Sequence, residues 1–176
     1  MPMSQRWPYI IGAAIAVILQ VIVAPNIQVL DAVPNFILCY AVACAVANPR
    51  NPRYIMVFII GLMYNLAGQG PLGSMALVCL LATFLASFAL RALETDTIVF
   101  PIITIAIMCF LGELGYGLLL MACGLNVGFL EALLHICLPC GLYDTVLALI
   151  AFPLIRRFVF GGKKQSEMSI IDTGLD

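Results

Sequence analysis

The chain has 176 residues, of which 64% are hydrophobic and only 10% charged, and its formal net charge is −1. A mean hydropathy of +1.12 is too high for a water-soluble domain of this size, so the composition indicates an integral membrane protein. The balanced charge, with no basic patch among aromatic residues, gives no electrostatic basis for binding nucleic acid, and we expect no such partner.

The first apolar stretch runs from about Tyr9 to Ala24, and we expect it to be an uncleaved transmembrane helix. Arg6 and the small residues at the end of the stretch are also typical of a secretory signal, but the rest of the chain is equally apolar. The second expected helix, from about Val33 to Ala47, opens with a proline and a short polar residue.

The next apolar segment, Tyr54 to Leu90, contains no charged residue and is too long for one crossing. As a single helix it would extend about 55 Å, whereas the hydrocarbon core of a bilayer is roughly 30 Å thick. The break "GQGP" at its centre favours a turn, because glycine adopts turn conformations and proline cannot continue a helix. The sequence therefore predicts a hairpin between two helices, Tyr54 to Ala67 and Leu72 to Leu93.

Two further helices are expected, from about Ile98 to Ala122 and from about Leu134 to Phe160, and each contains one acidic residue. Glu113 and Asp144 fall at a similar depth, in the outer half of the membrane. An ionisable side chain at such a depth costs on the order of 3 kcal/mol unless it is paired or hydrated. No Lys or Arg is available at that depth, so each acid is protonated, hydrogen-bonded or open to water.

A polar pocket open to the outer side is one interpretation of these acids. Together with Asn65, Tyr116 and Tyr143, Glu113 and Asp144 would line that pocket and receive a ligand or a partner. The alternative is that the acids form hydrogen bonds inside the helix bundle.

The basic residues orient the six helices. All eight Lys and Arg fall at the N-terminus, in the second and fourth loops, or near the C-terminus. Since basic residues concentrate on the cytoplasmic side, this asymmetry predicts six crossings with both termini in the cytoplasm. We expect one all-α, polytopic domain over residues 1–160 and a short disordered cytoplasmic tail over residues 161–176.

No catalytic or metal site is predicted. The motif Cys137-x-x-Cys140 lies near His135, but a closed metal site needs four ligands, and a redox motif needs a thioredoxin-like context. The chain has a single histidine, and no nucleophile lies beside a base. We therefore expect no cofactor and no enzymatic activity.

The order of features resembles a known family. Gln20 and Pro25 near the end of the first span, "VPNF" at the second, and the basic turn "NPRNPRY" precede "FIIGLMYNLAGQGPLGSMAL". The most specific residues are Gly61, Leu62, Asn65, Leu66, Gly70, Pro71, Leu72 and Gly73. This pattern resembles MreD, the rod shape-determining membrane protein family of the bacterial cell-elongation machinery. The resemblance covers Ile10 to Leu93, and the last two spans by topology alone.

The resemblance implies a non-enzymatic scaffold in the bacterial inner (cytoplasmic) membrane. Such a scaffold would bind the single-span protein MreC and, through it or beside it, the MreB filament and the peptidoglycan synthases of lateral wall growth. Asn65, Gly70, Pro71 and Gly73 would form the loop that contacts MreC, or Asn65 would instead bridge neighbouring helices. The family usually has an aspartate where this chain has Asn65, so a negative charge is lost there while hydrogen bonding is kept.

A second interpretation is the substrate-binding S component of an energy-coupling-factor importer. Those proteins also have six helices, and Ala13, Ala14 and Ala16 resemble their small-residue docking face. Glu113 and Asp144 would then belong to the substrate pocket. The two interpretations share an S-component-like six-helix bundle, so the fold does not choose between them.

Overall fold

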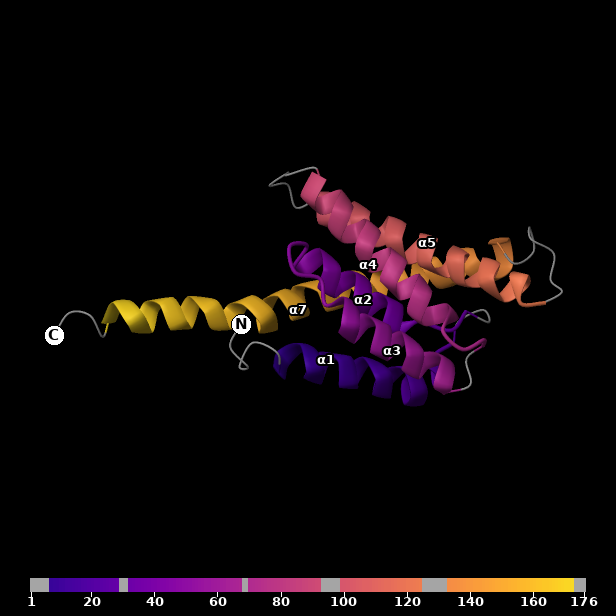
Figure 1. The fold of residues 1–176 in the computed structure, drawn as a ribbon, viewed down its shortest axis with the longest axis horizontal. Coiled ribbons are helices and arrows are strands. Elements are labelled where there is room, and N and C mark those ends of the chain that lie inside the picture. The colour runs from indigo at the N-terminus through magenta and orange to yellow at the C-terminus, as the bar shows by residue number, and fades with distance from the viewer. Residues whose placement is uncertain (1–6, 29–31, 68–69, 93–98, 125–132, 173–176) are drawn as a thin grey trace.

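The computed structural model describes residues 7–28, 32–67, 70–92, 99–124 and 133–172, without the side chains of 135, 136 and 158–172. The helices lie roughly along the long axis of the molecule, and the start of α1 and the far end of α7 point toward the same end (Figure 1). In chain order the elements are α1 (Trp7–Ile18), a π-helical turn (Leu19–Val23), a 3-10 turn (Ala24–Asn26), α2 (Phe36–Ala47), α3 (Tyr54–Leu66), α4 (Ser74–Ala92), α5 (Val99–Ala122), a π-helical turn (Leu133–Cys137) and α7 (Leu138–Asp172).

Within the described part of the chain, four helical stretches are long and apolar enough to cross a membrane: Trp7–Asn26, Ser74–Ala92, Val99–Ala122 and Leu138–Arg157. The other two apolar helices, α2 and α3, have 12 and 13 residues. The all-helical class is therefore confirmed for the described residues. Six crossings and the direction of the termini stay predictions.

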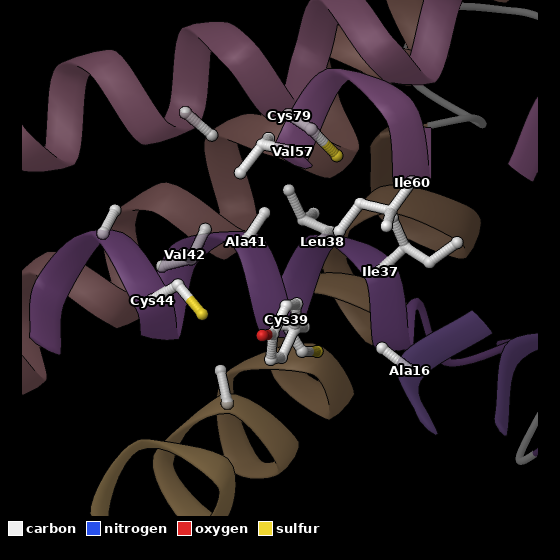
Figure 2. Close-up of a cluster of buried hydrophobic side chains, with 14 of the residues drawn as sticks. Ala16, Ile37, Leu38, Cys39, Ala41, Val42, Cys44, Val57, Ile60 and Cys79 are labelled. Atoms are coloured by element: carbon white, nitrogen blue, oxygen red, sulfur yellow. The ribbon is translucent and has the colours of Figure 1, made fainter. Parts of the chain in front are cut away.

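The centre of the bundle is α2, in which every residue from Ile37 to Val46 is buried. Figure 2 shows its side chains between Val57 of α3 and Cys79 of α4 on one side and α7 on the other. A helix of 12 residues extends about 18 Å, less than the hydrocarbon thickness of about 30 Å. Protein surrounds α2 on all sides, so its own length does not have to match the bilayer.

The predicted start of α2 at Val33 is wrong by three residues. Asn35 is the residue before the helix, and its side-chain oxygen accepts a hydrogen bond from the backbone N–H of Leu38 at 3.1 Å. This is the usual geometry of a helix cap, and the proline before Asn35 disfavours helical angles at Val33.

The predicted hairpin between the third and fourth helices is confirmed, because α3 ends at Leu66 and α4 begins at Ser74. Gly70 and Gly73 both have φ of +86°, a conformation that glycine adopts without strain. The other residues of the expected reversal, Gly68 and Gln69, lie outside the described part of the chain.

A close approach of α3 and α4 depends on Gly61. A Cβ atom on Gly61 would lie 2.6 Å from the Cα of Ala76 on α4, which is closer than two carbon atoms can approach. The backbones of the two helices are therefore in direct contact where the family-like motif begins.

The last helix, α7, continues to Asp172 and projects beyond the other helices (Figure 1). The expected domain boundary at residue 160 and the disorder of residues 161–176 stay predictions, because the side chains from 158 onward and residues 173–176 are not described.

Candidate functional site

The chain enters α2 in a non-helical conformation, and two buried side chains from other helices bind its backbone. Gln20 accepts a hydrogen bond from the N–H of Phe36 at 2.7 Å and donates one to the carbonyl of Pro34 at 3.3 Å. Asp144 accepts a bond from the N–H of Asn35 at 2.7 Å. Non-helical backbone at membrane depth is tolerated where protein groups satisfy it. Gln20 and Asp144 provide those groups.

Asn35 connects four helices through its side chain and its backbone N–H. Its side-chain oxygen caps α2, and its amide nitrogen donates to Oε1 of Glu113 on α5 at 2.9 Å. The same nitrogen lies 3.8 Å from the sulfur of Met75 on α4. Through its backbone N–H, Asn35 also binds Asp144 on α7. Only 3% of Asn35 is exposed, so these contacts form inside the bundle.

The two acids that the sequence singled out therefore meet at Asn35. Glu113 is 8% exposed and Asp144 is fully buried. Oδ2 of Asp144 has no hydrogen-bond partner among the described residues. Whether the acids also line a pocket open to the outside stays a prediction.

The two tyrosines of the predicted pocket make other contacts. Tyr116 lies one turn beyond Glu113 and packs edge to face against Tyr64, with the ring centroids 5.9 Å apart. Tyr143 donates a hydrogen bond from its hydroxyl to the carbonyl of Ile27 at 3.1 Å. Tyr143 thus ties the start of α7 to the chain that follows α1.

Asn65 is buried between α3 and the start of α4. Its side-chain oxygen accepts from the N–H of Met75 at 3.1 Å, and its amide nitrogen donates to the hydroxyl of Ser74 at 3.2 Å. Ser74 in turn donates to the carbonyl of Pro71 at 2.7 Å. Asn65 therefore holds the hairpin in place. Through Met75 the hairpin is continuous with the contacts around Asn35.

The described surface of the hairpin is largely apolar and open. Gly70 is exposed and Pro71 and Gly73 are partly exposed, and Leu66 and Leu72 are 67% and 73% exposed. Of the four residues predicted to bind a partner, Asn65 is thus a supporting residue and the other three belong to the surface.

Sequence reasoning did not assign a role to Asn35 or Gln20, although it noted both positions. A short polar residue between a proline and an apolar run is the usual signal of a helix cap. Gln20 stands out as an amide within the apolar first span. His135, from the motif with two cysteines, has a side chain outside the described residues.

Comparison with known proteins gives one result. A family model described as rod shape-determining protein MreD matches residues 3–160. This range includes the last two spans, which the sequence resemblance reached only by topology. No curated protein and no solved structure matches the chain.

Proposed function

The chain belongs to the MreD family of rod shape-determining proteins, and from this premise we propose that it is a non-enzymatic scaffold of the bacterial cell-elongation machinery. Its direct partner in this proposal is the single-span protein MreC. MreB and the peptidoglycan synthases join through MreC or beside it. The family supports a role in rod shape, and the helices suit a membrane protein that crosses the inner membrane several times.

The observation that carries the proposal is the construction of the α3–α4 hairpin. Asn65 and Ser74 fix the loop through buried hydrogen bonds, while Leu66 and Leu72 remain exposed. Where the described residues of a loop are already fixed by hydrogen bonds, binding costs less of their conformational entropy, so more of the contact energy contributes to affinity. The hairpin is therefore suited to act as a docking surface for another protein.

In the proposed orientation, the hairpin surface lies on the side of the membrane where a domain of MreC could reach it. With six crossings and both termini in the cytoplasm, the α3–α4 loop faces the outer side of the inner membrane. A single-span partner with a domain on that side would meet the hairpin next to the membrane surface.

The packing gives less support to an importer subunit. Two cavities, of about 870 and 640 Å³, lie on either side of α1, and neither is lined by Glu113 or Asp144. On the face expected to dock an importer partner, Ala13 and Ala16 are buried and only Ala14 is exposed. An S component would be stabilised against unfolding by its solute, whereas a scaffold would not.

The test is co-purification of MreC with a variant of the hairpin surface. Replacing Leu66 and Leu72 together by serine removes the exposed apolar area without touching the buried hydrogen bonds. Central apolar contacts at an interface contribute about 2 kcal/mol or more, so we expect at least about a tenfold loss of co-purified MreC. The matched control is Leu77→Ser, which changes an exposed leucine on α4 beyond the hairpin.

Membrane levels of each variant are measured beside the pull-down, because poor insertion would also lower the yield of complex. Equal retention of MreC by the hairpin variant and the control, at equal membrane levels, would remove the hairpin from the interface.

A further inference from the structure

An apolar groove runs along the bundle between α1 and α3. It has a volume of about 870 Å³, within the range of about 300–1,000 Å³ that is typical of ligand sites. Aliphatic side chains of both helices line it, among them Ile10, Val17, Ile59 and Met63. Neither Leu66 nor Leu72 of the hairpin surface lines the groove, so an inference about its occupant does not rest on the proposed function.

One end of the groove carries a cation. Arg53, the residue before α3, lines the groove, and its guanidinium carbon lies 4.7 Å from the centroid of the Tyr9 ring. The Nε atom of Arg53 is buried and has no hydrogen-bond partner among the described residues. The ring holds the guanidinium in position at this end of the groove, and the partly exposed side chain leaves it within reach of another molecule.

No acidic side chain within the described part of the chain neutralises Arg53. The two acids whose side chains are described, Glu113 and Asp144, bind Asn35 at the start of α2, whereas Arg53 follows the end of that helix. Arg50 lies three residues before Arg53 and is exposed, which adds to the positive charge. The groove is thus lined by apolar side chains along most of its length and by a basic side chain at one end.

The length of the groove identifies the kind of occupant. From Arg53 to Met63 the lining of α3 covers ten residue steps, or about 15 Å of helix. Half of a hydrocarbon core of about 30 Å is also about 15 Å. A partner helix that crossed the membrane would need a groove across both leaflets, whereas one acyl chain needs a groove across one.

We propose that this groove binds an anionic phospholipid. Its acyl chain lies between α1 and α3, and its phosphate accepts hydrogen bonds from the guanidinium of Arg53. Arginine suits this role because its planar donors match phosphate oxygens. Basic pockets between transmembrane helices at the cytoplasmic face bind anionic headgroups in this way.

The test uses the purified full chain in bilayer discs that contain equal amounts of phosphatidylglycerol and phosphatidylcholine. Native mass spectrometry then measures which lipid stays bound after release from the disc. One basic residue near the membrane surface favours an anionic lipid by about fivefold, so we expect that preference in the unchanged protein. Arg53→Gln should strongly reduce the preference, because only the exposed Arg50 then adds positive charge at this end, while Arg53→Lys should keep more of it.

The matched control is Arg91→Gln. Arg91 is in the last turn of α4, and its Nε donates to the carbonyl of Ser87 at 3.0 Å. It has the same charge but does not line the groove, so the preference should remain. Equal retention of both lipids by the unchanged protein, or an undiminished preference in Arg53→Gln, would overturn the proposal.

A second variant tests the acyl-chain part of the site without changing charge. Ala14 is exposed and lines the groove, so Ala14→Phe should fill it without disturbing the core. We expect this variant to lose the bound lipid, whereas Ala122→Phe, at an exposed position on α5 outside the groove, should retain it. Undiminished lipid in Ala14→Phe would show that lipid binds elsewhere and would overturn the proposed site.

Discussion

Replacing Asn35 by alanine should destabilise the protein more than any other single change in the polar network. The variant loses the cap on α2 and the donor to Glu113 in one step. Both partners are buried, so no water replaces the lost side chain without rearrangement.

The magnitude follows from the two contacts. Loss of a helix cap costs about 1 kcal/mol. A buried acceptor left without its donor costs about 1–3 kcal/mol, of which we take about 2. The expected total is about 3 kcal/mol, which for a chain of this length lowers the melting temperature by about 6–12 °C. The long contact between Asn35 and the sulfur of Met75 is not counted because it is weak.

The assay is thermal unfolding of the purified protein in one detergent, and Asn35→Ser is the matched variant. Serine is also a good cap residue but is too short to keep the bond to Glu113, so it should recover about 1 kcal/mol relative to alanine. A loss below about 1 kcal/mol in Asn35→Ala would contradict the role of Asn35 as the junction of four helices. Equal stabilities of the serine and alanine variants would contradict the capping role of Asn35 but not its hydrogen bond to Glu113.

Four further changes test the packing, the entry to α2 and the loop by the same unfolding assay. Gly61→Ala should destabilise the protein by at least about 2 kcal/mol, because the new Cβ would overlap the backbone of Ala76. Gly115→Ala is the control: the atom nearest to its new Cβ is 3.9 Å away, so it should stabilise the helix by about 0.5–1 kcal/mol. Equal effects of the two variants would contradict the close approach of α3 and α4. Gln20→Leu should cost about 1–3 kcal/mol, since it leaves the carbonyl of Pro34 and the N–H of Phe36 without their partner at the start of α2. An unchanged melting temperature would mean that other groups replace Gln20. Gly73→Ala should cost about 1–2 kcal/mol through its positive φ alone, because no atom lies within 4 Å of the new Cβ; a neutral result would show that the loop relaxes to another conformation.

Local signals in the sequence were sufficient to predict that the helices and the hairpin exist. The apolar length from Tyr54 to Leu90 requires a reversal, and glycine and proline mark its place. The start of α2 was less predictable, because a run of apolar residues does not show where helical hydrogen bonding begins. Asn35 decides that point through its cap, and the pattern was misjudged by three residues.

The candidate site was predictable in part for a different reason. An acid in an apolar helix is conspicuous, so Glu113 and Asp144 could be identified from the free-energy cost of placing an ionisable side chain within a membrane. Their common partner could not, since the bonds that join them to Asn35 span 78 and 109 residues of sequence. Spacing along one helix carries no information about such contacts.

The structure also explains how asparagine can occupy position 65, where the family resemblance leads one to expect aspartate. The bond that fixes the hairpin is accepted by the side-chain oxygen from the N–H of Met75, and an aspartate oxygen would accept it equally well. The second bond differs, because Asn65 donates to the hydroxyl of Ser74, and this leaves the hydroxyl proton free for the carbonyl of Pro71. An aspartate could only accept from Ser74 and would compete with Pro71 for that proton. Asparagine therefore satisfies both sides of Ser74 without adding another acidic group to a bundle in which Glu113 and Asp144 are already buried.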